Sequence, residues 1–312
     1  MDDNLCGKFG SLREYLPDDL GDSKLDFYGN KSFENYCPGK NCNSKLEKIT
    51  IGFLWLLEQY FGTYRSTGYG DNTNPFFLYM ISWLSYKLKQ NSVDGSTTIN
   101  GFYNEHVKDS GKYTKFINAA NTFTNLEDVL NTKSDLFNNN IEDLSEFYDV
   151  FKLICSMYNN VETNNHDKLP NNANAFIEKY KELDNNCNIK GTARSKIFSA
   201  LSTDYDNLKN YCNKKGANCK DFSPLPEITT KFSAHISGDT LSNSSTGNKL
   251  FTVLSIFGAI AFFLGISYKV NNKELKKYIH CIYANVSKKI IRLSFYISIR
   301  YLDFGNELKN NI

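Results

Sequence analysis

Residues 141–158 read IEDLSEFYDVFKLICSMY and carry the clearest secondary-structure signal in the chain. Apolar side chains recur there every three or four residues, and most of the charged and small polar residues of the segment lie between them. This spacing places the apolar side chains on one face of an α-helix. The segment therefore predicts an amphipathic helix that packs against other helices. The members of its apolar stripe are Ile141, Leu144, Phe147, Phe151, Ile154, Cys155 and Tyr158.

Two earlier segments extend the helical pattern. Residues 44–64 begin with the pair Ser44 and Glu47, the capping-box spacing that satisfies backbone N–H groups at a helix start. An Asn-Pro pair at 74–75 places an N-cap before a proline at the first helical position, which predicts a helix over 76–90. Apolar residues occur on nearly every side of that second helix, so we expect it at the centre of the core.

Shorter apolar patterns predict the remaining helices, and no segment alternates apolar and polar residues as a half-buried strand would. The asparagine-rich stretches 131–140 and 159–174 are expected to connect helices. The predicted fold class is therefore all-α, with a helical bundle over residues 1–228. Further helices are expected within residues 111–131, 173–183 and 193–212.

Residues 250–268 form an uncharged apolar run, LFTVLSIFGAIAFFLGISY, from Leu250 to Tyr268. As a helix this run spans about 28 Å, close to the ~30 Å thickness of bilayer hydrocarbon. We predict a single transmembrane helix rather than a buried core helix, because soluble helices keep a polar face. The Ser/Thr/Gly-rich residues 229–249 before it are expected to form a flexible stalk. A candidate helix-packing face of the span consists of Gly258, Ala261 and Gly265.

Basic residues after the span set its expected orientation. Residues 269–312 carry nine Lys and Arg against three acids, a net charge of +6, whereas the rest of the chain carries 27 against 31, a net charge of −4. The positive-inside rule then puts this tail in the cytoplasm and the body on the opposite side. Apolar residues among the basic ones are typical of a segment lying on anionic lipid, but a tail helix without membrane contact fits equally well. The candidate lipid contacts are Lys269, Lys273, Lys276, Lys277, Lys288, Lys289 and Arg292.

The N-terminal residues do not resemble a secretory signal. Residues 1–30 contain no apolar segment of the required length, and Asp2 and Asp3 stand where basic residues belong. Asp2 also excludes N-myristoylation, which requires glycine after the initiator methionine. We therefore expect the span itself, or a dedicated export route, to direct membrane insertion.

Eight cysteines divide between the two sides of the span, and Cys281 is alone in the tail. Cys155 lies in the apolar stripe and is expected to be a buried free thiol. The other six are disulfide candidates in two groups of three. If all six pair, at least one bridge must join the two groups. These candidates are Cys6, Cys37, Cys42, Cys187, Cys212 and Cys219.

The spacing of the cysteines limits which of them can form disulfides with each other. Cys187 and Cys212 flank a predicted helix of about 28 Å, whereas a disulfide needs Cα atoms within about 7 Å. Cys212 with Cys219, or Cys187 with a partner in the first group, fits better. A zinc site built from CPGKNC and CNKKGANC is the alternative, but its spacings are looser than those of typical structural zinc sites. We expect disulfides, assuming a body in an oxidising compartment.

No pattern of catalytic or cofactor-binding residues occurs in the sequence. The four histidines lack H-E-x-x-H spacing, and there is no P-loop, dinucleotide-binding glycine pattern or G-x-S-x-G motif. A thiol oxidoreductase using Cys37 or Cys42 is the alternative enzymatic hypothesis. The acidic body does not favour nucleic acid as a partner. We therefore predict a non-enzymatic protein that uses no cofactor or metal.

Several segments together resemble the Plasmodium interspersed repeat (PIR) family, in its rodent-malaria Cir/Yir/Bir branch. They occur across residues 1–270 in the family's order. The matching stretches are LCGKFGSLREYLPDDL, FENYCPGKNC, LEKITIGFLWLLEQYF, SEFYDVFKLICSMY, IFSALSTDYDNLKNYC and KLFTVLSIFGAIAFFLGISYK.

The resemblance implies a variant antigen of a multigene family, exported into the infected erythrocyte, with a helical ectodomain, one transmembrane helix and a short cytoplasmic tail. It implies immune evasion, adhesion and antigenic variation through binding to a host receptor or antibody, and it carries over no catalytic residue. The alternative is an intracellular membrane scaffold or trafficking protein whose basic tail docks on lipid or partner proteins. Exposure of the body on intact infected cells distinguishes the two hypotheses.

Overall fold

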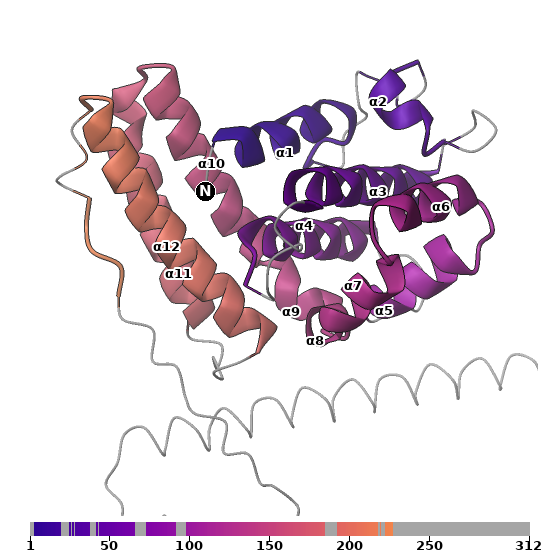
Figure 1. Cartoon of the computed structure of the whole chain (residues 1–312). Coiled ribbons are helices and arrows are strands. Elements are labelled where there is room, and N and C mark those ends of the chain that lie inside the picture. Colours follow the sequence, from indigo (N-terminus) through magenta and orange to yellow (C-terminus); the bar gives the residue numbers. More distant parts are fainter. Residues whose placement is uncertain are drawn as a thin grey trace, which may run out of the picture. The chain divides into compact units, whose positions relative to one another are not determined.

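Helices form every regular element in the part of the chain that the structure describes, together with one isolated antiparallel bridge between Thr98 and Asn140 (Figure 1). This architecture confirms the all-α fold class predicted for the body. The computed structural model describes residues 3–19, 25, 27, 29–37, 42, 44–65, 73–91, 98–184, 192–217, 219 and 222–226.

The helices vary from single turns to five or six turns. The first half of the body contains α1 (Asp3–Tyr15), α2 (Lys31–Glu34), α3 (Lys45–Tyr64), α4 (Pro75–Asn91), α5 (Ile99–Phe102) and a π-helical turn, η3 (Tyr103–Lys108). It continues with α6 (Thr114–Phe123), α7 (Leu126–Thr132), α8 (Ser134–Phe137) and α9 (Ile141–Ser145). The second half contains α10 (Phe147–Glu162), a 3-10 turn, η4 (His166–Lys168), α11 (Leu169–Asp184) and α12 (Ala193–Lys214).

The central helix is α4, as the apolar pattern of residues 76–90 predicts. It contacts α3, α5, α8, α9, α10 and α12, so other helices cover it on all sides (Figure 1). Its start is capped by Asn74, whose side-chain oxygen accepts hydrogen bonds from the backbone N–H groups of Phe76 and Phe77 at 3.0 and 3.4 Å. A helix with apolar residues all round is stable in water only when it is enclosed in this way.

The contact between α3 and α4 depends on a glycine. A Cβ atom at Gly52 would lie 2.8 Å from Cη2 of Trp83, closer than carbon atoms pack. The Trp83 side chain is fully buried and has no room to move aside without disturbing the core. Glycine at position 52 therefore allows the largest side chain of α4 to lie directly against α3.

A buried hydrogen bond joins α4 to α12. The hydroxyl of Tyr79 donates to Oδ2 of Asp204 at 2.6 Å, and both residues are almost completely buried. Burial, followed by the charge of Asp204, raises the pKa of Tyr79 well above its ordinary value. The hydroxyl therefore stays protonated and continues to donate to the carboxylate throughout the physiological pH range.

A charge cluster around Asp18 fixes the chain segment that follows α1. Lys87 of α4 is only 2% exposed, lies 3.4 Å from Asp18 and donates a hydrogen bond to the carbonyl of Pro17. Arg13 and Lys152 lie 3.8 and 3.9 Å from the second carboxylate oxygen of Asp18. Burial lowers the pKa of Lys87, and the neighbouring carboxylate opposes that shift. The cluster thereby gives a buried ammonium group its partners and links α1 to α4 and α10.

The helices α10, α11 and α12 form a layer beside α4, with α10 in contact with both of the others (Figure 1). Every member of the predicted apolar stripe is buried. The stripe is nevertheless divided between two helices, because α9 ends at Ser145 and α10 begins at Phe147. The predicted single helix over 141–158 is therefore wrong at this one junction.

The asparagine-rich segments are more helical than predicted. Residues 131–140 include α8, whose Leu136 and Phe137 are buried in the core. Residues 159–174 contain the end of α10, the turn η4 and the start of α11. Asparagine disfavours helix interiors only weakly, so burial of neighbouring apolar side chains outweighs it. The sequence also did not predict α1, α5 or the π-helical turn that follows α5.

The expectation that Cys155 is a free thiol is wrong. Cys155 on α10 forms a disulfide with Cys6 on α1, with the Cα atoms 5.3 Å apart. The helices α1 and α10 pack against each other, and both cysteines lie on the packed faces. The same position in the apolar stripe that indicated burial therefore brings Cys155 to a partner. A bridge between the two groups of three was expected only if all six candidates paired with one another, and this condition is not met because Cys6 pairs with Cys155.

Two further disulfides close short loops. They join Cys37 to Cys42 and Cys212 to Cys219, with Cα separations of 5.7 and 6.0 Å. The second is a pairing that the sequence favoured. Both proposed zinc half-sites are thus engaged in disulfides, and no cluster of metal-ligating side chains occurs among the described residues. Cys187 lies outside those residues.

None of the helices within the described ranges is both long enough and apolar enough to cross a membrane. The predicted stalk (229–249), span (250–268) and tail (269–312), with the candidate packing and lipid-contact residues in them, lie outside the ranges that the structure describes.

Removing the disulfide between α1 and α10 should destabilise the body more than removing the disulfide that precedes α3. The bonded residues are 149 positions apart in the first case and 5 in the second. In the chain-entropy account these loops correspond to about 5 and about 2 kcal/mol. Urea unfolding of the full chain, followed by near-UV circular dichroism, compares Cys6→Ala/Cys155→Ala with Cys37→Ala/Cys42→Ala. Equal losses, or a non-reduced peptide map without a Cys6–Cys155 link, would contradict the pairing.

Tyr79→Phe should lower the free energy of unfolding by about 1–3 kcal/mol, because a buried carboxylate loses a hydrogen-bond donor while the ring packing is kept. The matched control is Tyr211→Phe. Its ring packs against Tyr158 with centroids 5.4 Å apart, and its hydroxyl makes no hydrogen bond to a described residue. The control should change stability by less than about 0.5 kcal/mol. Similar losses for the two variants in urea unfolding would show that the Asp204 contact is not stabilising.

Candidate functional site

A surface cavity of about 330 Å³ opens where the chain after α2, the C-terminal half of α3 and helix α6 meet. We call it the α3–α6 pocket. The elements around it are joined by direct contacts of α3 with both α2 and α6. It is a plausible size for a small ligand, since ligand sites commonly enclose about 300–1,000 Å³.

Small residues on the two facing helices leave the space. Gly62 lies on α3, and Ala119 and Ala120 lie on α6. A Cβ atom built at Gly62 would meet nothing within 4 Å. Glycine inside a helix costs about 1 kcal/mol relative to alanine. No close packing in the described structure requires glycine here, so its effect is to keep the pocket open.

Aromatic rings form much of the pocket lining. Tyr36 and Phe116 are buried and meet edge to face, with centroids 5.7 Å apart. Phe61 from α3 is also buried, whereas Phe123 at the end of α6 is 46% exposed. Phe123 is therefore an unusually exposed ring at the mouth of an otherwise buried aromatic surface.

Two cations and one acid stand at the rim. The guanidinium of Arg65 lies over the Phe123 ring, 4.9 Å from its centroid, and Nζ of Lys115 donates to Oδ1 of Asn35 at 3.4 Å. Within the described structure neither cation forms an ion pair. The acid is Glu58, which is hydrogen-bonded by the hydroxyl of Tyr36. The rim therefore carries a net positive charge with the anion already engaged.

Tyr36 is held in its neutral form. Burial, followed by the hydrogen bond and charge of Glu58, raises the pKa of Tyr36 far above its ordinary value. Its hydroxyl therefore acts as a donor to Glu58 and does not add negative charge to the pocket. Tyr36 therefore does not offset the positive charge of the rim at physiological pH.

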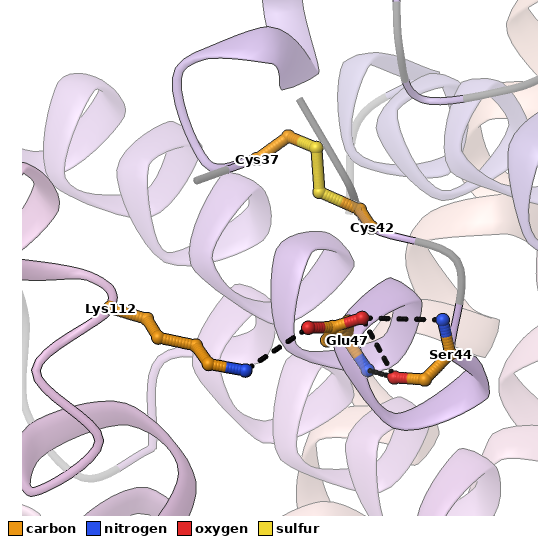
Figure 2. The surroundings of a disulfide bond; sticks show 5 residues. All are labelled: Cys37, Cys42, Ser44, Glu47 and Lys112. Carbon is orange, nitrogen blue, oxygen red and sulfur yellow. Dashed lines mark hydrogen bonds and ion pairs between the residues drawn. A yellow bond between two sulfur atoms is a disulfide. The ribbon is translucent and has the colours of Figure 1, made fainter. Parts of the chain in front are cut away.

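A disulfide and an ion pair lie close to the pocket in sequence, at the ends of the elements that form it. Cys37 directly follows Tyr36 and is bonded to Cys42, which lies two residues before the Ser44 N-cap of α3 (Figure 2). The α3 start is the predicted capping box: Ser44 Oγ accepts from the Glu47 N–H at 3.1 Å, and Glu47 accepts in return from the Ser44 N–H. Lys112, just before α6, donates to the other Glu47 oxygen at 3.1 Å.

Glu47 thus connects the two helices that form the pocket. Burial on its own would raise the pKa of Glu47, but hydrogen bonds from Lys112 and Ser44 outweigh burial and lower the pKa. The lowered pKa means that the ionised carboxylate stabilises the folded state. The link between α3 and the start of α6 is therefore weakened in acid.

The six cysteines within the described residues lie in three places. Cys6 and Cys155 join α1 to α10. The Cys37–Cys42 bond lies next to Tyr36 of the α3–α6 pocket. The Cys212–Cys219 bond joins the last turn of α12 to the chain that follows it. The sequence did not identify any residue that lines the pocket. A glycine within the apolar residues 44–64 and an Ala-Ala pair within 111–131 were the available signals. Neither signal indicates that the two helices face each other.

Glu47→Gln should lower the free energy of unfolding by about 1 kcal/mol at pH 7, the usual contribution of a helix cap. Because the folded pKa is lowered, the ionic stabilisation is complete above about pH 4.5 and is lost as the pH falls through the folded pKa. The difference between the variant and the unmodified chain should therefore shrink toward pH 3 in urea unfolding. Glu178→Gln is the control, since exposed Glu178 on α11 forms no ion pair with a described residue. A loss that is independent of pH would contradict the role of the charge.

Comparison with known proteins agrees with the sequence pattern and the fold. A family model described as Plasmodium variant antigen protein Cir/Yir/Bir matches residues 6–269. Neither the search of curated proteins nor the search of solved structures gives a match. The matched range begins within α1 and includes the rest of the helical body together with the apolar residues 250–268. Since this range is most of the chain, the chain belongs to the Plasmodium Cir/Yir/Bir variant antigen family.

Proposed function

We propose that this chain is a variant antigen displayed on the infected red cell, which acts without catalysis by binding a host molecule or by presenting a changeable antigenic face. The body faces outward, residues 250–268 cross the membrane once, and the basic tail faces the cytoplasm. Membership of the variant antigen family supports the class of function.

The disulfides are the observation that carries the proposal. Among the described residues, three bonds lie in the helical body, and the cysteines in them are buried. Structural disulfides persist in oxidising, extracytoplasmic compartments and are rare where thiol reductants are abundant. A body of this kind is suited to the side of the membrane opposite the cytoplasm. The positive charge of residues 269–312 favours the same orientation.

The construction of the body also suits sequence variation. The core is aromatic and enclosed around α4, and one disulfide links α1 covalently to α10. Substitutions at exposed helix positions and in loops usually change stability by no more than about 0.5 kcal/mol. Exposed residues of such a body are therefore free to differ between family members without loss of the fold. Recognition and antigenic change both require a stable fold with a changeable exterior.

Protease treatment of intact infected cells tests the proposal. We expect protease added outside to degrade the body while a tag placed after Ile312 stays protected, because the tail lies inside. Detergent-permeabilised cells provide the control in which both regions are cut, and a soluble host protein confirms that intact cells remain sealed. A body that resists protease in intact cells but is cut after permeabilisation would refute surface display. That result would favour the intracellular scaffold hypothesis.

A further inference from the structure

We propose that the α3–α6 pocket binds a small aromatic anion, with the aromatic group among the pocket rings and the anionic group at Arg65 and Lys115. This inference goes beyond recognition of host macromolecules and does not depend on surface display. It requires only the folded body. Its basis is the combination of an open cavity, an aromatic lining and a rim whose cations have no acidic partner among the described residues.

The charge of the rim indicates the sign of the ligand. The Arg65 guanidinium lies over the Phe123 ring, and Lys115 donates to the neutral amide of Asn35. Neither cation forms an ion pair with a described residue. Glu58, the acid that lines the pocket, accepts a hydrogen bond from Tyr36. The body has a net negative charge, which repels anions from most of its surface. The two cations at the mouth of the cavity oppose this repulsion locally. An anionic group gains an ion pair with either cation, while a cationic ligand gains no pair at these positions.

The lining indicates the chemical class of the uncharged part of the ligand. Edge-to-face and offset stacked contacts favour a planar ring between the aromatic side chains that line the pocket. Its volume of about 330 Å³ lies at the lower end of the range for ligand sites, which suits one or two fused rings rather than a long acyl chain. The Phe123 ring is 46% exposed, so a ligand that enters the pocket covers part of its surface. Gly62 and Ala119 leave the necessary space on opposite walls.

The test uses three probes with one ring system and different charge: 2-naphthoate, neutral 2-naphthalenemethanol and cationic 2-naphthylmethylammonium. Saturation-transfer NMR on the full chain in lipid discs measures their dissociation constants, and empty discs give the background. A ligand of this size should bind with a dissociation constant of about 1 mM or tighter. Two exposed ion pairs should make naphthoate bind about fivefold to tenfold more tightly than the ammonium probe.

Substitutions in the pocket, with a control outside it, test where naphthoate binds. Gly62→Leu fills the pocket, suits a helix better than glycine, and should abolish naphthoate binding while the midpoint of unfolding is kept or raised. Gly7→Leu makes the same change at an exposed position on α1 with open space around it and should leave binding unchanged. Lys115→Gln should weaken naphthoate about threefold and leave naphthalenemethanol unaffected. Ala119→Leu fills the pocket from the opposite wall and replaces Gly62→Leu if that variant fails to fold.

Three results would overturn the inference. The first is no binding of naphthoate above the empty-disc background at about 10 mM, tenfold above the expected constant. The second is equal affinity for the three probes, because the rim charge would then play no part. The third is naphthoate binding that survives in a folded pocket-filling variant, which would place the ligand elsewhere. Each result is independent of whether the body is exposed on intact cells.

Discussion

The arrangement of the body depends on the enclosure of α4. Almost every side chain from Phe76 to Leu88 is buried, and burial of each large apolar side chain contributes about 1.5–3 kcal/mol. A helix of this kind must have neighbours on every side, so α3 lies on one side while α9, α10 and α12 cover the others. Polar groups buried with it are given partners: Tyr79 pairs with Asp204, and Lys87 pairs with Asp18. The enclosed helix thus determines where the remaining helices and their polar contacts lie.

The covalent links have different roles around this core. The Cys6–Cys155 bond joins helices that are far apart in sequence. It therefore lowers the conformational entropy of the unfolded chain more than the bonds that close short loops. The other two bonds close short loops at the ends of helices. One of them fixes the chain that carries Tyr36 into the α3–α6 pocket. The stability of the body thus depends mainly on the core and on the Cys6–Cys155 bond. The Cys37–Cys42 bond mainly affects the surface around the α3–α6 pocket.

The α3–α6 pocket is a place where helix packing is incomplete. Elsewhere α3 packs so closely that Gly52 is required against Trp83, but ten residues later Gly62 faces open space. The same residue type thus allows close contact at one site and maintains a cavity at the other. At the mouth of this cavity, Arg65 and Lys115 form no ion pair with a described residue, and their positive charge contrasts with the mildly acidic body around them. The contrast distinguishes the pocket from an ordinary surface depression.

The sequence by itself determined the helical class, the capped starts of α3 and α4, and the central position of α4, because these depend on local spacing and on apolar pattern. It also predicted a membrane span and a basic tail, which lie outside the described residues. Only the tertiary structure decided that Cys155 has a partner and that asparagine-rich residues around Phe137 are helical. It alone brought Gly62 to face α6. These features depend on which helix faces meet, and contacts between residues distant in sequence leave no periodic signal in either segment.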